Sequence, residues 1–495
     1  MSGREAILRE AEAAEILRRL KPSLRPTQDE LRRAAAAFRE IKAVIDATLS
    51  SELKGIEYVV ELEGSVAKGT AISGDLDLDV FILIGRKDLN NRWLETHVVG
   101  PLVRRFTCLA GYRVSLRYAS HPYIHLITPS GIEADIVPAY RAPSPAAIVT
   151  PVDRTPFHTR YIKEHLAEPL KDEVRLLKKF FKSIGVYGAE IRNEGFSGYL
   201  CELLILKYGS FLNLLKNIVR WREPQVIAVD EGALVEASEL RKVFRNAPLI
   251  VLDPVDPRRN AAASVSRRSF ALAMVASYEF LLNPDEKFFN PVHTYEDLNR
   301  LETVLNSTGR AALIIFWRMK RSTPPDIMWG EVKSAGRSLA NVLRSRSYTV
   351  TDVRFWAHED LGILAAYIEI FKTFGDYVLR RGPPRAGPEM LRFMHKHLGD
   401  VPVRAWIDHE GTPYAVTKVS KSFVDIVFEY VNTHKLKHAE AVVVCERLRN
   451  AASFLKEKIA HNSPGILTDF LYWLTEAVLK TPPWLARGVS SSGSM

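Results

Sequence analysis

The chain has 495 residues, 47% of them hydrophobic, which is enough apolar material for a large core divided among about two to four domains. Lysine and arginine number 68 against 58 aspartate and glutamate residues, and the formal charge of +10 favours a polyanionic partner such as nucleic acid. Three widely spaced cysteines form neither a disulfide framework nor a zinc-ligand pattern: Cys108, Cys201 and Cys445.

The hydropathy of the chain indicates the compartment in which it acts. No segment approaches about 18 consecutive apolar residues, so we expect no membrane span. The amino terminus alternates charged and apolar residues and lacks the uninterrupted apolar stretch of a signal peptide. We therefore expect a cytoplasmic protein whose cysteines lie reduced in the core.

The first 50 residues have helical periodicity. Apolar spacing predicts an amphipathic helix over about 4–20 that stops before Pro22. A second helix, running to about residue 49, is predicted to begin at the capping box formed by Thr27 and Glu30.

After about residue 55 the apolar residues recur with the spacing of β-strands. Two connections interrupt the strands: residues 88–110 have a helical pattern, and residues 128–131, Thr-Pro-Ser-Gly, predict a hairpin turn. The predicted strands are 56–62, 78–84, 113–119, 123–128 and 132–140. Residues 1–150 are therefore expected to form one α/β unit.

Two further regions follow. The connector 141–156 contains four prolines and marks a domain boundary. Residues 151–290 have mostly helical patterns, with a helix that closes at Gly185 and a central helix over 196–218. Residues 291–495 are mixed, and the last eight predict a flexible tail. In this region we expect strands at 311–319, 353–360 and 361–371 and a helix at 331–343.

Two carboxylates stand in a strand that is otherwise apolar. Asp77 and Asp79 point to the same face about 6.5–7 Å apart and repel by roughly 2–3 kcal/mol at an effective dielectric near 20. Divalent cations compensate such a pair well. The alternative is that one aspartate caps a turn and the other lies at a solvated strand end, but the following VFILI is typical of an interior strand. Asp75 would point to the same face as Asp77 and Asp79 if the strand began earlier, yet Gly74 places it in the turn.

A Gly-Ser pair precedes these carboxylates by eleven residues. Glycine permits close approach of a ligand, and the hydroxyl of Ser65 with nearby N–H groups can hold phosphate oxygens. The combination matches the signature of the DNA polymerase β nucleotidyltransferase superfamily, which is expected to have a third carboxylate on a neighbouring strand. Glu133 and Asp135 share one parity, and Asp135 is favoured because apolar residues follow it directly.

Longer motifs resemble those of archaeal, class I CCA-adding enzymes, which are tRNA nucleotidyltransferases. The resemblance is strong over about residues 55–270 and weaker beyond 290, and it rests on GSVAKGT, GDLDLDVF, IEADIVPAY, VDRTPFHTRYI, EVRLLKKFFKSIGVYGAE, GFSGYLCELLILKYGSFL and LDPVDPRRNAA. It implies an α+β multidomain fold: a nucleotidyltransferase-type mixed-sheet catalytic head with a helical extension (1–150), a helical neck (151–290), and a mixed α/β body and tail (291–495).

The resemblance also implies the reaction and its partners. CTP and ATP supply the CCA that is added to the 3′ end of immature tRNA, without a nucleic-acid template, with Mg²⁺ as cofactor and pyrophosphate as product. A homodimer is left open. Within the superfamily, a poly(A) or poly(U) polymerase would share the same carboxylates. An RNA-binding protein with a vestigial site is the alternative from another class, and the intact aspartates speak against it.

Individual roles follow from the same resemblance. The metal carboxylates and catalytic residues would be Asp77, Asp79 and Asp135. Ser65 and Lys68 would contact the triphosphate, although Lys68 stands where a family member has Arg, and Asp77 where it has Glu. The remaining nucleotide contacts would be His158, Lys178, Tyr187 and, for reading the base, Arg259, with Arg258 as its immediate neighbour. Taken singly, His158 would be a helix-capping or core histidine, Lys178 part of a solvated helix face, and Tyr187 an ordinary loop aromatic.

Pairs of basic residues are candidates for holding tRNA phosphates. The alternative for each pair is an ordinary solvated surface. The pairs are Arg220 with Arg222 around Trp221, Lys320 with Arg321, and Arg380 with Arg381.

Overall fold

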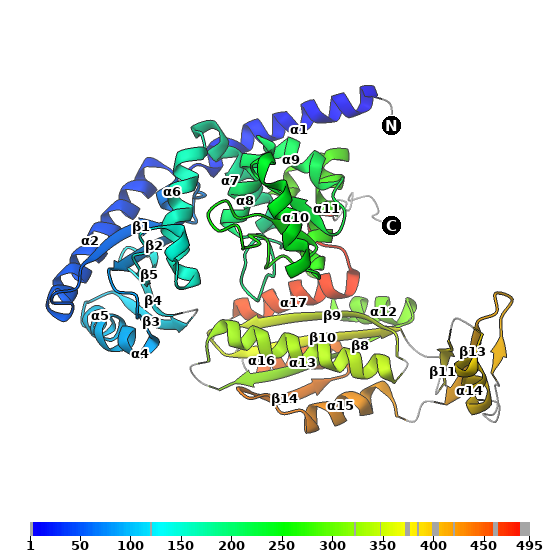
Figure 1. Ribbon diagram of the computed structural model, residues 1–495. Helices are drawn as coiled ribbons and strands as arrows, with labels where there is room; N and C mark the ends of the chain where they lie inside the picture. The colour runs from blue at the N-terminus through cyan, green and yellow to red at the C-terminus, as the bar shows by residue number, and fades with distance from the viewer. Residues whose placement is uncertain are drawn as a thin grey trace, which may run out of the picture. The chain divides into compact units, whose positions relative to one another are not determined.

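The computed structural model separates the chain into two compact units, Met1–Pro291 and Val292–Met495 (Figure 1). It describes residues 3–118, 121–320, 323–346, 348–371, 377–383, 386–397, 405–418, 421–458 and 464–485, so the expected tail at 488–495 and Arg321 lie outside the described residues. Each unit is a mixture of helices and sheets, as the predicted α+β class requires. The finer division into head, neck, body and tail stays a prediction.

The amino-terminal helices are α1 (Gly3–Leu24) and α2 (Gln28–Glu52). The capping box at Thr27 is confirmed, with both of its hydrogen bonds present. The expectation that the first helix stops before Pro22 is wrong, because α1 continues to Leu24. A proline this close to a helix end removes a single backbone hydrogen bond, and the burial of Leu24 holds the last turn in place.

A five-stranded sheet in the order β1-β2-β5-β4-β3 forms the centre of the first unit. β2 and β5 are parallel and the other neighbours are antiparallel. The strands are β1 (Tyr58–Glu63), β2 (Leu78–Ile84), β3 (Arg113–Tyr118), β4 (Pro122–Ile127) and β5 (Glu133–Tyr140). All five lie where the sequence predicts them, to within a few residues. The antiparallel β4–β5 turn closes through Gly131 N–H to Thr128 O, as predicted.

Helices cover one face of this sheet. The predicted helical stretch at 88–110 is confirmed as α4 (Asn91–Leu94), a π-helical turn and α5 (Gly100–Thr107). Together with α2, α5 packs on the side chains of Leu78, Val80 and Ile82 in one hydrophobic core (Figure 1). Because side chains alternate along a strand, the odd-numbered positions of β2 point to the other face.

One residue of α2 holds the turn that leads into β2. Glu30 accepts hydrogen bonds from Gly74 N at 2.6 Å and from Ser73 Oγ at 2.9 Å, in addition to its part in the capping box. The hydrogen bond from Thr27 N in the capping box, followed by the one from Gly74 N, lowers the pKa of Glu30 from 4.5 to about 2. The helix that covers the sheet therefore also fixes the entry to the acidic segment.

Glu30→Gln is expected to lower the melting temperature at pH 7, because the amide accepts these bonds less strongly than the carboxylate. A carboxylate with a depressed folded-state pKa stabilises the fold above its unfolded value and loses that contribution as pH falls through the folded value. The difference in melting temperature between wild type and variant should therefore shrink between about pH 4.5 and pH 2. A difference that stays constant over this range would contradict the assignment.

Helices dominate the rest of the first unit. They are α6 (Thr155–His165), α7 (Glu168–Ser183), α8 (Gly198–Tyr208), α9 (Phe211–Ile218), α10 (Leu234–Val243) and α11 (Arg267–Leu282). The prediction of one central helix over 196–218 is wrong, because Gly209 adopts φ +76° and Ser210 caps a new helix. A parallel strand pair was also missed, since three-residue strands are too short to show a period: β6 (Gln225–Ile227) and β7 (Leu249–Val251).

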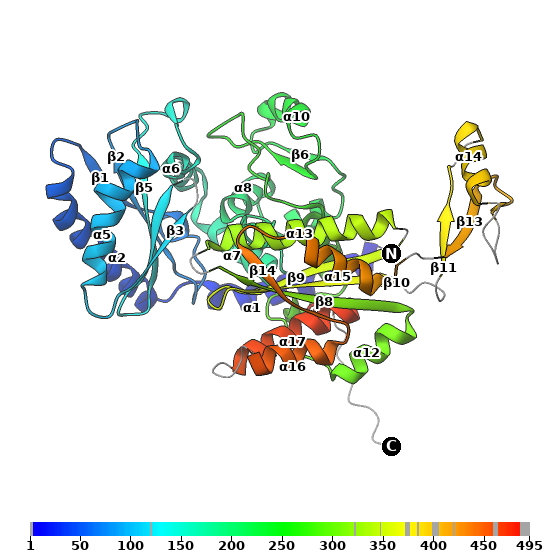
Figure 2. The same ribbon diagram turned by 90° about the horizontal axis from the view of Figure 1, so that it is seen from below.

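The second unit contains a four-stranded sheet in the order β14-β8-β10-β9. Its strands are β8 (Arg310–Met319), β9 (Val350–His358), β10 (Ile363–Phe371) and β14 (Ala439–Cys445). Helices α13 (Pro325–Ser345) and α15 (Phe423–Thr433) cover one face, as Figure 2 shows. The other face is covered by α12 (Leu298–Ser307), α16 (Leu448–Lys458) and α17 (Pro464–Leu479). The strands and the helix predicted after residue 290 are confirmed.

A smaller sheet of the second unit has the order β11-β13-β12 and carries one helix. Its elements are β11 (Tyr377–Arg381), β12 (Trp406–Ile407), β13 (Pro413–Lys418) and α14 (Pro388–His397). Across the described residues of both units, no helix is long and apolar enough to cross a membrane.

Candidate active site

A cavity of about 930 Å³ opens in the first unit beside the parallel strands β2 and β5. Helix α3 (Gly64–Lys68) and helix α7 supply other parts of its wall. The predicted site residues that line it are Asp77, Asp79, Asp135, Ser65, Lys68, Lys178 and Tyr187. Segments separated by more than 100 residues in sequence are thus brought to one place.

The register of the parallel strands brings two of the carboxylates together. Asp79 of β2 lies directly beside Asp135 of β5, and Asp77 immediately precedes β2. Glu133, the alternative to Asp135, is more than half exposed and does not line this cavity. The geometry therefore favours Asp135 as the third carboxylate.

Glycine at position 64 is required by the closeness of Asp79. Gly64 has φ +67°, and a Cβ at this position would stand 1.7 Å from Asp79 Oδ2. A side chain at this position would collide with Asp79 unless the carboxylate or the backbone moved. The Gly-Ser pair and the acidic pair are consequently one packed structure, which explains why both are needed in the sequence signature.

The carboxylates resist ionisation in this setting. Burial, followed by the charge of Asp135, raises the pKa of Asp79 from 3.8 to about 6. Burial and the neighbouring Asp75 also raise the pKa of Asp77. Acidic groups that repel one another in a concave site are stabilised by bound cations.

Asp75 and His125 are two further residues near the carboxylates. Asp75 lies in a turn, as expected, but its side chain still lines the cavity, where it pairs with Lys182. His125 of β4 places Nδ1 2.8 Å from Asp135 Oδ1 and so fixes the orientation of that carboxylate.

The predicted lysines line the same cavity from different helices. Lys68 belongs to α3 and Lys178 to α7, and their exposed fractions are 7% and 2%. Both pair with Glu202 of α8. The interpretation of Lys178 as a solvated helix face is therefore wrong.

His158 and Arg259 do not line this cavity; they meet around Asp253. His158 Nε2 lies 2.9 Å and Arg259 Nη1 2.8 Å from Asp253 Oδ2, and Tyr199 donates to the other oxygen at 3.0 Å. Burial alone would raise the pKa of Asp253, but these donors hold it well below its usual range. The His158 ring stacks on Tyr199 at 3.9 Å, and Lys68 Nζ lies 5.9 Å from the same Tyr199 ring, so the cluster adjoins the cavity.

Comparisons with known proteins bear on what this site belongs to. A family model described as the second domain of tRNA nucleotidyltransferase matches residues 172–290. The CCA-adding enzyme of Saccharolobus shibatae is 33% identical over 440 residues, which are 84% of this chain and 99% of that protein. The chain belongs to the CCA-adding enzyme family. The family's enzymes from Sulfurisphaera tokodaii (33% identical, 95% of this chain and 98% of that protein) and Pyrobaculum islandicum (35%, 78% and 85%) agree.

A solved structure of a cytoplasmic RNA terminal U-transferase is also similar. It shares 15% identity over 56% of this chain and 98% of that chain, with a TM-score of 0.43. This chain is a tRNA nucleotidyltransferase of the CCA-adding family, and the matched region 172–290 spans α7 to α11 of its first unit.

Among the described residues, no group of three or more His, Cys, Asp and Glu side chains is arranged to hold a metal ion by protein ligands alone. Mg²⁺ is commonly held by one or two carboxylates together with substrate phosphates and water. Asp77 and Asp79, whose pKa values are raised, and Asp135, which lies beside Asp79, are carboxylates that can serve as such a partial set of ligands. The residues present therefore fit this cofactor.

Sequence reasoning missed the residues that hold the predicted ones. Glu202 is a charge in the middle of an apolar helix, and this contrast could have indicated a buried ion pair. His125 is the register partner of Asp135 on β4, so its side chain points to the same face of the sheet. It could be found from the sequence only if the pairing of β4 with β5 were already known. Asp253 gave no signal beyond its place in the DPVDPRR motif.

The basic pairs have different surroundings. Arg220 and Arg222 are exposed, but Trp221 is 4% exposed and stacks on Phe270, so it is a core residue and not a surface aromatic. Lys320 is exposed and donates to Lys437 O at 2.9 Å.

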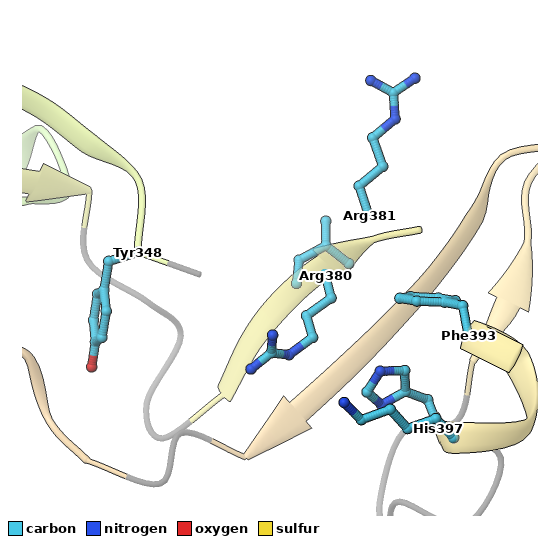
Figure 3. A pocket seen from close by; sticks show the side chains of 7 residues that line it. Tyr348, Arg380, Arg381, Phe393 and His397 are labelled. Atoms are coloured by element: carbon cyan, nitrogen blue, oxygen red, sulfur yellow. The ribbon is translucent and has the colours of Figure 1, made fainter. Parts of the chain in front are cut away.

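Arg380 and Arg381 line a separate cavity of about 390 Å³ in the second unit. Figure 3 shows Arg380 extending into the space between Tyr348 and His397, whereas Arg381 extends the opposite way, as adjacent strand residues must. The cavity combines cations with aromatic rings, and its lining is Tyr348, Leu379, Arg380, Arg381, Phe393, Lys396 and His397.

Proposed function

We propose that this chain adds CCA to the 3′ end of immature tRNA from CTP and ATP, with Asp77, Asp79 and Asp135 as the catalytic and metal-binding carboxylates. The observation that carries the proposal is one cavity lined both by the paired Asp79 and Asp135 and by the buried lysines Lys68 and Lys178. Carboxylates and ammonium groups in the same cavity suit a metal-bound nucleoside triphosphate.

The residues of the chain divide the reaction between them. Lys68, Lys178 and the hydroxyl of Ser65 hold the triphosphate, and Tyr187 contacts the nucleotide. The tRNA 3′ oxygen forms a bond to the α-phosphorus as the bond to pyrophosphate breaks. Asp77, Asp79 and Asp135 would hold Mg²⁺ together with the substrate phosphates, and the bound ion would lower the pKa of the attacking hydroxyl and neutralise phosphate charge. Most of the rate enhancement would come from positioning and charge neutralisation.

Base selection is assigned to the cluster around Asp253. The Arg259 guanidinium is 35% exposed, so it can reach a base edge while Asp253 fixes its direction. His158, held by the same carboxylate, would contact the nucleotide beside Lys68. A fixed guanidinium rejects bases that lack the matching acceptors, because a mismatch leaves buried polar groups unpaired.

Incubation with tRNA that lacks its 3′ end tests the proposal. With CTP and ATP together, the product should be extended by CCA and then stop, and CTP alone should give extension by cytidine only. An indefinite tail from one nucleotide would indicate a poly(A) or poly(U) polymerase. Binding of tRNA without any incorporation would indicate an RNA-binding protein with a vestigial site.

We further propose that the basic pairs hold tRNA phosphates, chiefly Arg380 and Arg381 in the cavity of the second unit. The double variant R380A/R381A is expected to weaken tRNA affinity roughly tenfold at low salt and to reduce the slope of log affinity against log salt by about one to two. Affinity for CTP should stay unchanged. Arg18 and Arg32 are exposed and each pairs with an acidic residue one turn away on its own helix, so the double variant R18A/R32A is the charge-matched control.

An equal loss in R18A/R32A would mean that only the net charge matters, and an unchanged salt slope in R380A/R381A would exclude phosphate contacts there.

The cytoplasm is the proposed compartment. Cys108, Cys201 and Cys445 are free thiols, which suits reducing conditions. Cys201 and Cys445 are buried as expected, but the expectation of a core position is wrong for Cys108, which is exposed.

A further inference from the structure

Glu202 is a buried charge that does not line the cavity. It stands in the middle of α8, whose neighbouring residues are apolar, and its side chain is 0% exposed. A carboxylate without solvent is stable only if its partners compensate the lost hydration. Its partners therefore indicate what the charge is for.

Three side chains from two parts of the first unit converge on this carboxylate. Lys68 Nζ donates to Oε2 at 2.6 Å, Thr70 Oγ1 donates to Oε1 at 2.6 Å, and Lys178 Nζ lies 3.4 Å from Oε1. Lys178 also donates to the carbonyl oxygen of Thr70 at 3.2 Å. Glu202 thus fixes the ammonium groups that enter the cavity from α3 and from α7.

The charges of this group do not cancel. Two lysines face one carboxylate, so the cluster keeps a net positive charge directed at the cavity. Burial lowers the pKa of Lys178, and Glu202 opposes that shift. Without the carboxylate, Lys68 and Lys178 would repel each other in a site almost closed to water.

We propose that Glu202 is a positioning residue for nucleotide binding, which holds Lys68 and Lys178 in place and aimed at the phosphates of the incoming CTP or ATP. It acts only through the two lysines and touches no substrate. The inference rests on the proposed function, because it takes the cavity to be the triphosphate site.

Glu202→Gln keeps the shape of the side chain and removes its charge. The Kd of CTP and of ATP, measured at equilibrium without RNA, should rise roughly tenfold, and KM should rise with it while kcat changes by less than about threefold. Affinity for tRNA should not change. Unaltered nucleotide affinity in this variant would overturn the proposal.

A double-mutant cycle separates this role from a merely structural one. Lys68→Met alone should also weaken CTP binding roughly tenfold. If Glu202 acts through Lys68, the variant K68M/E202Q should fall well short of the roughly hundredfold product of the single effects. Effects that multiply fully would show that the two residues act independently and would also overturn the proposal.

Two more variants keep the test decisive if E202Q folds poorly. Thr70→Val removes the hydroxyl that bonds to Glu202 and lies 3.1 Å from Lys178, at a residue that is 0% exposed, and should raise the Kd of CTP by about threefold. Glu369→Gln is the matched control, because Glu369 is likewise 0% exposed and pairs with Arg310 in the second unit. It should leave the Kd of CTP unchanged.

If T70V binds CTP as tightly as the E369Q control, the proposal fails. Failure of the proposed function has a different signature, since wild-type protein would then add no CCA to truncated tRNA whatever the nucleotide affinities of these variants.

Discussion

Replacement of Asp79 by asparagine is expected to lower the rate of CMP and AMP incorporation at saturating nucleotide by at least about a hundredfold. Asp79 lies beside Asp135 and against Gly64, so the amide keeps the packing and removes one charge of the metal-binding pair. The Kd of CTP should change much less, because the lysines and Ser65 remain. Single-turnover extension of truncated tRNA and equilibrium binding of CTP measure the two effects separately.

Asp75→Asn is the matched control. Asp75 lines the same cavity but pairs with Lys182 and stands outside the register of β2 with β5. We expect less than about a tenfold loss of rate for this variant. Near-normal turnover of D79N with Mg²⁺ would refute the assignment of Asp79. Equal losses in both variants would mean that the total negative charge of the cavity matters and not the Asp79–Asp135 pair.

Gly64→Ala is expected to abolish most of the activity as well. The new Cβ would stand 1.7 Å from Asp79 Oδ2, so either the carboxylate or the backbone of α3 must move by more than an ångström. A displacement of this size at a catalytic carboxylate costs about a hundredfold in rate. The measurement is again single-turnover extension of truncated tRNA.

A second glycine provides the control for backbone strain. Gly55 has φ +77°, close to the +67° of Gly64, but a Cβ there meets nothing within 4 Å. Gly55→Ala should therefore lose only stability, roughly 1–2 kcal/mol, with normal turnover of the folded protein. If G64A were as active as G55A, the packing of Gly64 against Asp79 would have no bearing on catalysis.

The sequence predicts the sheet and the carboxylates of the first unit well, because strand periodicity and the spacing of Asp77 and Asp79 are local properties. It predicts the break at Gly209 poorly, since a helix with apolar residues on every side has no period that shows where it ends. The proline in α1 failed as a stop for a different reason, because tertiary packing of Leu24 outweighs a local preference.

In the candidate site, too, local sequence features were predictable and contacts made by tertiary packing were not. The spacing of residue types predicted the three carboxylates and Ser65, and the family resemblance added Lys68, Lys178 and Tyr187 to the expected cavity lining. The lysines' partner could not be predicted, since Glu202 meets Lys68 only after helices 134 residues apart in sequence have packed together. For the same reason, His158 and Arg259 could be assigned to nucleotide contact by resemblance, whereas their common attachment to Asp253 required coordinates.

The position of α2 decides how this protein can be truncated. Ile41, Ile45 and Leu49 are completely buried beneath the catalytic sheet, and Glu30 reaches the turn before the acidic strand. A truncated gene whose first codon lies at the start of β1 would thus encode a sheet with one apolar face exposed to water. The recombinant product should collect in inclusion bodies, although every catalytic codon would be intact.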